Sequence, residues 1–174
     1  MSEGWFNFAA LMFVQFLVFL GHAAYEKKLA DVPRILVLGA LSGIVPGITC
    51  DLLFGKYLGL VSFAFEINPL SLILDAVIGY GLFAANVLLM SRARLLHFCT
   101  WMLIVTASFE ITNLYFHVWT YAFPVLSVEF VLFGLVGAVV LAISIALSWH
   151  VLFKYRFVFL ESISNAQIGW VMLK

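Results

Sequence analysis

Five long apolar stretches decide what this chain can fold into. They cover residues 5–25, 34–54, 69–90, 95–116 and 127–149. Each stretch has the roughly 20 residues that a helix needs to cross about 30 Å of hydrocarbon. Only 10% of the residues are charged, against about 25% in soluble domains. The sequence therefore predicts an all-α integral membrane protein, a multi-pass bundle of five helical spans.

The positions of the cations predict the orientation of this bundle. Every Lys and Arg except Lys56 falls on one side of the five spans, and the positive-inside rule places that side in the cytoplasm. We expect the N-terminus outside and the C-terminus inside. No cation precedes the first apolar stretch, so it is interpreted as a retained anchor and not as a signal peptide. Residues 1–150 would form one transmembrane domain and residues 151–174 a cytoplasmic interfacial tail.

Charge and cysteine usage exclude several classes of function. The formal net charge is zero and no basic run is present, so a nucleic-acid partner is not expected. Cys50 and Cys99 lack the spacing of a disulfide framework or a zinc site. The acids and histidines also lack the paired Glu-x-x-His spacing of di-iron bundles. No metal and no other cofactor is predicted.

Two local patterns carry structural predictions. Gly39, Gly43 and Gly47 recur every fourth residue, a stripe of small side chains that lets a neighbouring backbone approach closely. We expect a homodimer contact through this face. Asn68 followed by Pro69 is a strong start signal for the third span, because asparagine caps a helix and proline suits its first position.

A polar stripe in the fourth span marks the candidate site. Thr106, Glu110, Asn113 and His117 follow one another in helical steps and so share one face. An ionisable group at membrane depth costs roughly 2.5 to 3.5 kcal/mol, so this face should point into the bundle. Single polar residues in the first span, such as Gln15 and His22, are interpreted as interhelical hydrogen bonds.

Four acids from four spans are expected at one depth. Asp51, Asp75, Glu110 and Glu129 lie near the outer ends of spans two to five, where they would share a pocket. Desolvation and mutual repulsion would then keep a proton available on one carboxyl group. Glu110 is the first candidate catalytic acid, followed by Asp75 and Asp51. The candidate substrate-binding residues around them are Asn113, Tyr115, His117, Trp119, Tyr121 and Glu129.

An internal repeat adds a resemblance to a known family. The segment from Asp51 to Gly59, followed by Asn68-Pro69-Leu70 and Asp75, parallels Glu110 to Trp119, followed by Pro124 and Glu129. This order resembles the repeat of the small carotenoid-type lycopene cyclases, and less closely that of integral-membrane terpene cyclases. The resemblance covers about residues 35–140. It implies that Asp51 and Glu110 are the first acids of the two copies, and that Asp75 and Glu129 are the second.

The resemblance and the acids together predict a function. We expect a membrane-integral acid–base enzyme that protonates an alkene or epoxide of a carotenoid or terpenoid, with cyclisation or isomerisation, or with lyase chemistry. Its partners would be the bilayer and a lipophilic small-molecule substrate. Two alternatives use the same acids differently. One is a small proton- or cation-coupled carrier, and the other is an accessory subunit of a membrane enzyme.

Overall fold

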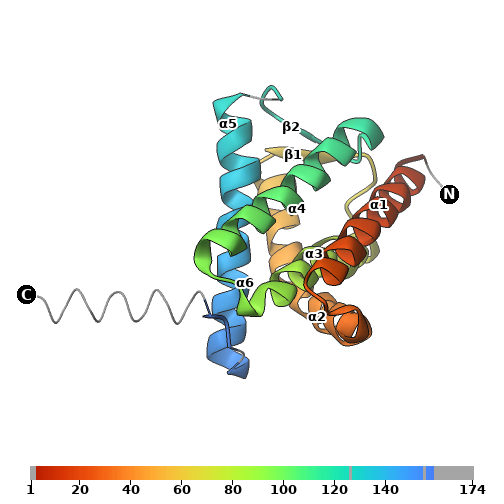
Figure 1. Ribbon diagram of the computed structural model, residues 1–174. Helices are drawn as coiled ribbons and strands as arrows, with labels where there is room; N and C mark the ends of the chain where they lie inside the picture. The colour runs from red at the N-terminus through yellow and green to blue at the C-terminus, as the bar shows by residue number, and fades with distance from the viewer. Residues whose placement is uncertain (1–2, 126, 155, 159–174) are drawn as a thin grey trace, which may run out of the picture.

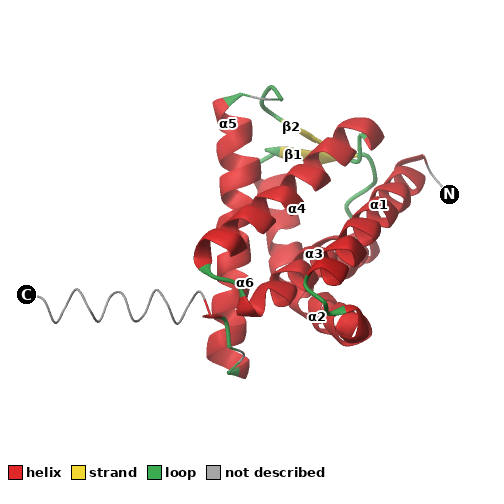
Figure 2. Cartoon of the chain, in the orientation of Figure 1, coloured by secondary structure: helices red, strands yellow, loops and turns green. Residues whose placement is uncertain are grey.

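The computed structural model describes residues 3–125, 127–154 and 156–158. These residues form a bundle of long helices with a two-stranded sheet at one end (Figure 1, Figure 2). The elements in chain order are α1 (Glu3–Tyr25), the 3₁₀ turn η1 (Leu29–Asp31), α2 (Val32–Cys50), the π-helical η2 (Asp51–Tyr57), β1 (Val61–Phe63), α3 (Pro69–Leu89), the 3₁₀ turn η3 (Met90–Arg92), α4 (Leu95–Phe116), β2 (Trp119–Tyr121), α5 (Val128–Phe130), the π-helical η4 (Val131–Val136) and α6 (Gly137–Phe153).

Five helical segments among the described residues are long and apolar enough to cross a membrane. They are Glu3–Tyr25, Leu29–Tyr57, Pro69–Arg92, Leu95–Phe116 and Val128–His150. The number and placement of the predicted spans are confirmed. The second segment is longer than predicted, because α2 continues without a break into the π-helical turns of η2.

The start of α3 follows the predicted capping pattern. The Asn68 side chain accepts hydrogen bonds from the backbone N–H groups of Leu70 and Ser71, both at 3.0 Å. The Ser71 hydroxyl in turn accepts from the Asn68 N–H at 2.8 Å. Reciprocal bonds of this kind satisfy donors that the first helical turn leaves unpaired. They fix the start of α3, which is the most buried of the five long helices. In its most apolar stretch 67% of the residues are buried, against at most 39% in the others.

The glycine stripe places α2 directly against α3 of the same chain. A Cβ atom at Gly43 would lie 2.5 Å from the backbone nitrogen of Gly81, and one at Gly47 would lie 2.8 Å from the Cα atom of Ala76. The predicted close backbone approach is therefore confirmed. Within the chain, α3 covers the face formed by Gly39, Gly43 and Gly47, and the homodimer stays a prediction.

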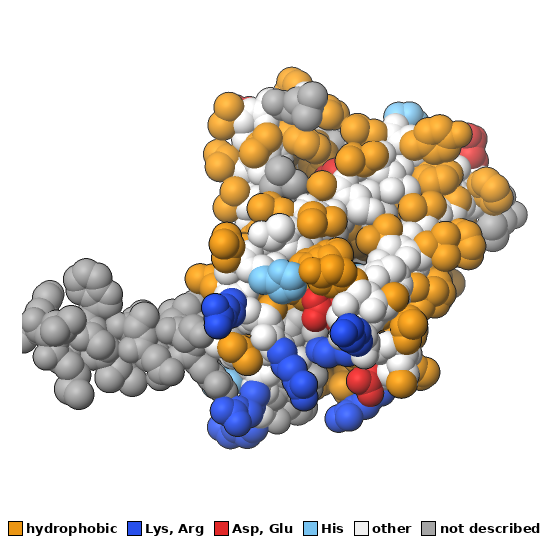
Figure 3. All heavy atoms as spheres, viewed as in Figure 1, with side chains coloured by type: hydrophobic (Ala, Val, Ile, Leu, Met, Phe, Trp, Pro, Cys, Tyr) orange, Lys and Arg blue, Asp and Glu red, His pale blue; other side chains and the backbone are white. Residues whose placement is uncertain are grey.

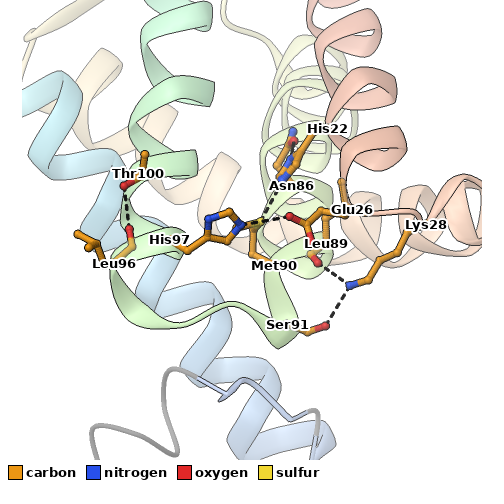
Figure 4. Close-up of polar contacts among 10 residues, drawn as sticks. All are labelled: His22, Glu26, Lys28, Asn86, Leu89, Met90, Ser91, Leu96, His97 and Thr100. Atoms are coloured by element: carbon orange, nitrogen blue, oxygen red, sulfur yellow. Dashed lines mark hydrogen bonds and ion pairs between the residues drawn. The ribbon is translucent and has the colours of Figure 1, made fainter.

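The single polar residues of α1 make interhelical hydrogen bonds, as predicted. Gln15 Nε2 donates to the Ser108 carbonyl and to Thr112 Oγ1, each at 3.1 Å, which joins α1 to α4. His22 Nδ1 lies 2.7 Å from Asn86 Oδ1 on α3 (Figure 4). The His22 ring also stacks on Trp101 of α4, with 4.2 Å between centroids. These side chains hold α1, α3 and α4 together.

One end of the bundle is basic. Figure 3 shows Lys and Arg side chains gathered at the end of the molecule where α1 leads into α2 and where α6 ends. Exposed cations of the described residues at this end are Lys27, Arg34, Arg92, Arg94, Lys154 and Arg156. Lys56 lies at the opposite end, on η2.

Two contacts at this basic end tie the helix ends together (Figure 4). His97 Nε2 lies 3.3 Å from Glu26 Oε1, which pairs the start of α4 with the end of α1. Lys28 Nζ donates to the Leu89 carbonyl at 2.5 Å, and so places a cation at the C-terminus of α3, where the helix dipole favours it. Partial burial lowers the pKa of Lys28, and the neighbouring Glu26 opposes that shift.

The C-terminal part differs slightly from the prediction. The last helix, α6, ends at Phe153 and not near residue 149. Most of the predicted interfacial tail, residues 159–174, lies outside the described residues.

Candidate functional site

A cavity of about 560 Å³ lies at the sheet end of the bundle. Side chains from α1, α2, η2, β1, α3, α4, β2, η4 and α6 line it. Its volume is within the range of roughly 300 to 1,000 Å³ that is usual for small-molecule sites. Figure 3 shows an acidic side chain within the apolar surface between α4 and α5, near this end. The cavity is therefore large enough for a ligand and carries carboxyl groups in an apolar wall.

Two of the candidate acids form a pair in the cavity. Asp51 is the first residue of η2 and Asp75 lies in the second turn of α3; both are buried. Both carboxyl groups line the cavity and lie close enough to interact with each other. Two carboxylate charges so close in an apolar site repel each other, which favours a state in which the pair carries one proton. The Tyr80 hydroxyl donates to Asp51 Oδ1 at 3.3 Å, which adds a third polar side chain to this pair.

The third acid, Glu110 of α4, accepts a hydrogen bond from the strand β2. The Tyr121 hydroxyl donates to Glu110 Oε1 at 2.6 Å, and Trp119 Nε1 donates to the Tyr121 oxygen at 3.2 Å. Burial, together with the neighbouring Glu110 charge, raises the pKa of the Tyr121 phenol. The phenol therefore stays protonated and donates. This hydrogen bond fixes the position of the Glu110 carboxyl group in the cavity wall.

A short sheet brings the aromatic donors over the cavity. The strands β1 and β2 pair antiparallel, with Val61 opposite Tyr121 and Phe63 opposite Trp119. Side chains alternate between the two faces of a strand, so these four residues share one face and line the cavity. The sequence did not predict either strand, because each has only three residues and their partners are distant in sequence.

Asn113 lies outside the cavity and has a structural role instead of the predicted substrate contact. Its Oδ1 atom accepts from the backbone N–H groups of Val118 and Trp119 at 3.0 and 2.9 Å, and its Nδ2 atom donates to the Trp119 carbonyl at 2.9 Å. These bonds form the turn that directs β2 over the cavity. Only Thr106 and Glu110 of the predicted polar stripe line the cavity.

His117 also lies outside the cavity. It ends α4 in the left-handed backbone region, with φ 51°, and its side chain is exposed. Because the helix ends there, the helical spacing that placed His117 on the stripe no longer applies. Tyr115 is 79% exposed and does not line the cavity either.

Glu129 is the acid that the structure does not bring to the others. Ser127 caps the helix by accepting from the Phe130 N–H at 3.1 Å, so Glu129 lies in the first turn of α5. Phe130 is buried, and successive residues of a helix point about 100° apart. Glu129 is accordingly exposed. The predicted pocket of four acids is corrected to a pocket of three.

Aromatic residues that were not predicted from the sequence complete the wall of the cavity. Phe54 of η2 contacts Phe133 of η4 edge to face at 4.9 Å, and Phe133 lies 5.8 Å from the Tyr121 ring. Tyr80 was missed because it lies five residues after Asp75, outside the steps of three and four that define a helical stripe. Further aromatic residues of the wall are Phe63, Phe83 and Phe109.

The described residues contain no group of three or more His, Cys, Asp or Glu side chains arranged to hold a metal ion. Comparisons of the chain with protein-family models, with curated proteins and with solved structures give no match.

Proposed function

We propose that the chain is a five-span membrane protein that works as an acid–base enzyme on a carotenoid or terpenoid. It protonates an alkene or epoxide of the substrate and closes a ring or shifts a double bond. The observation that carries this proposal is the placement of three acids, the neighbouring Asp51 and Asp75 and the separate Glu110, in one cavity walled by aromatic rings.

The charge distribution supports an orientation with the N-terminus outside and the C-terminus in the cytoplasm. The cations of the described residues gather at the end opposite the sheet, except Lys56, which lies on η2 next to Gly55 of the cavity wall. By the positive-inside rule the basic end faces the cytoplasm. The cavity then lies in the outer half of the membrane.

The hydrogen bonds favour a different division of roles from that expected from the sequence. The pair of Asp51 and Asp75 holds a proton that it can donate to an alkene carbon of the substrate. Glu110 lies apart from this pair and accepts the Tyr121 hydroxyl, so we assign it to the second step, in which a proton leaves the carbon skeleton. The enzyme returns to its starting state when the proton passes from Glu110 back to the pair. No oxidant or reductant is needed, because the substrate gains one proton and loses one.

The aromatic wall suits the charge that develops between these two steps. Protonation of an alkene leaves a carbocation, and the faces of Trp, Tyr and Phe rings attract cations. Trp119, Tyr121, Phe133 and Phe54 surround the space beside the acids. The cavity also excludes bulk water with its apolar side chains, which protects a carbocation from hydration.

The resemblance to the small lycopene cyclases adds a substrate class to this proposal. Three of the four acids matched by that resemblance, Asp51, Asp75 and Glu110, line the cavity. A long apolar isoprenoid is a ligand that an apolar cavity within a membrane can take up.

The experiment compares variants of the acids in membranes supplied with linear isoprenoid precursors. Asp75→Asn and Glu110→Gln keep the side-chain shape but remove the carboxyl group, and should lower turnover by about 10²- to 10⁴-fold. Glu129→Gln is the matched control, because this acid is exposed, and should keep full turnover. Folding is checked by thermal unfolding in detergent. Full turnover by folded Asp75→Asn and Glu110→Gln proteins would contradict the proposal, and proton-coupled uptake without conversion would favour the carrier.

A further inference from the structure

The cavity reaches the surface of the bundle at η4 and α6. Val140 and Leu132 line the cavity and are nevertheless 58% and 57% exposed. Ser144, one turn further along α6, also lines the cavity and is exposed. A residue that faces both the cavity and the outside marks an opening. On a span that is apolar enough to cross a membrane, this outside is the hydrocarbon of the bilayer.

Two contacts frame this opening. At the sheet end, Phe54 of η2 meets Phe133 of η4. Toward the basic end, Trp149 Nε1 of α6 donates to Ser42 Oγ of α2 at 2.6 Å. Ser42 and Phe54 are separated by 12 positions, or roughly 18 Å at the helical rise of 1.5 Å per residue. We call the opening between these two contacts the lateral window.

The α6 side of the window is lined by small residues. A Cβ atom at Gly134 would lie 3.8 Å from Glu110 Oε1, and one at Gly137 would lie 3.9 Å from the Leu132 carbonyl oxygen. These are ordinary contact distances, so the space beside each glycine is free, in contrast to the glycines of α2. With Ala138 and Ser144 they form a shallow track from the window to the Glu110 carboxyl group.

The edges of the window offer nothing to a polar headgroup. The Ser144 hydroxyl donates to the Val140 carbonyl of its own helix at 2.9 Å, and the Ser42 hydroxyl donates to the Leu38 carbonyl at 2.6 Å. The Trp149 N–H is bonded to Ser42. Among the described residues that line the cavity there is no Lys or Arg to bind a phosphate. An uncharged hydrocarbon therefore suits this opening better than a phospholipid does.

We infer that the lateral window admits a long, linear, uncharged isoprenoid from the bilayer and holds its chain along α6 while one end reaches the acids. This inference rests on the proposed function for the identity of the substrate. It adds that the substrate enters sideways, and that only one end of the chain needs to fit inside the cavity. The length of the substrate is then not limited by the cavity volume, because the remainder of the chain extends into the lipid.

The test uses a linear prenyl hydrocarbon that carries a diazirine at one end, with the full-length protein in membranes. Irradiation should attach the probe to residues of the cavity wall, which are mapped by mass spectrometry. Val140→Trp fills the window and should lower this labelling at least about tenfold, or about 1.4 kcal/mol. Leu147→Trp is the matched control, because Leu147 is exposed on the same helix and does not line the cavity, and its labelling should equal that of the wild type. Ser144→Leu provides a second, smaller obstruction in case the tryptophan impairs folding.

The outcomes separate this inference from the proposed function. Equal labelling of Val140→Trp, Ser144→Leu and the wild type would overturn the lateral window. Equal labelling by a diazirine-bearing phosphatidylcholine would also overturn it, since a membrane lipid would then occupy the opening. Labelling that depends on the window in a protein that converts no isoprenoid would uphold the hydrocarbon site and refute the enzyme. Asp75→Asn should still be labelled, because the probe needs no proton transfer.

Discussion

Replacement of Gly43 by alanine should destabilise the protein strongly, although it adds only one methyl group. The added Cβ atom would lie 2.5 Å from the Gly81 nitrogen, and it would also meet the Ala76 carbonyl oxygen. Ordinary contact begins at 3.4 Å, so the atom is about 0.9 Å too close. Backbone atoms cannot rotate away as the end of a side chain can. The two helices must therefore move apart along their whole contact.

The size of the effect follows from this separation. A gap of about 0.5 to 1 Å removes roughly a quarter to a half of the attraction between packed atoms. If roughly 60 atom pairs are affected, about as many as one buried leucine makes, at about 0.15 kcal/mol each, the loss is about 2 to 5 kcal/mol. Ordinary overpacking costs about 1 to 3 kcal/mol, so the change lies at or above that range. For a chain of this length the Tm should fall by roughly 5 to 15 °C.

The assay is thermal unfolding of the purified protein in detergent, followed by circular dichroism. Gly21→Ala is the control, because a Cβ atom there meets nothing within 4 Å. It should leave the protein unchanged or stabilise it by at most about 1 kcal/mol, since alanine favours the helix. Gly43→Leu should be worse than Gly43→Ala, and worse than Leu36→Ala. If Gly43→Ala unfolded at the same temperature as Gly21→Ala, the close packing of α2 on α3 would be refuted.

Three further predictions concern other parts of the molecule. Asn113→Ala should lower the free energy of unfolding by about 2 to 4 kcal/mol, because it leaves the Val118 and Trp119 N–H groups without their acceptor. Chemical or thermal unfolding measures this loss, and a variant as stable as the wild type would contradict the structural role of Asn113. Tyr121→Phe should lower isoprenoid turnover at least about tenfold without unfolding the protein, because it removes the donor to Glu110. Unchanged turnover would show that this hydrogen bond does not contribute to the reaction. Burial lowers the pKa of Lys28 in the folded protein, so at alkaline pH the unfolded chain binds more protons than the folded one. The stability should therefore rise as the pH rises toward the unfolded pKa of 10.5. A comparison of Tm against pH should show this rise in the wild type and not in Lys28→Met.

The sequence by itself determined the spans and several local features. A stretch of about 20 apolar residues specifies a membrane-crossing helix wherever it occurs, which is why all five spans were found. The cap at Asn68 was predictable for the same reason, since it depends on residues two and three positions away. The glycines of α2 indicated close backbone packing but not the identity of the other helix. Asp51, Asp75 and Glu110 could be selected because acids are rare at membrane depth.

Only the tertiary structure decided which of these residues meet. Helical spacing assigns a side chain to a face only while the helix lasts, and α4 ends at His117, so this residue left the predicted stripe. The strands β1 and β2 pair across 60 positions of sequence, and no local pattern records such a contact. That pairing places Trp119 and Tyr121 over Glu110. On α5 the buried side chain is Phe130, so the neighbouring Glu129 points away from the cavity. Depth in the membrane is a property of each span alone, whereas the direction in which a side chain points into the cavity depends on how all the spans pack.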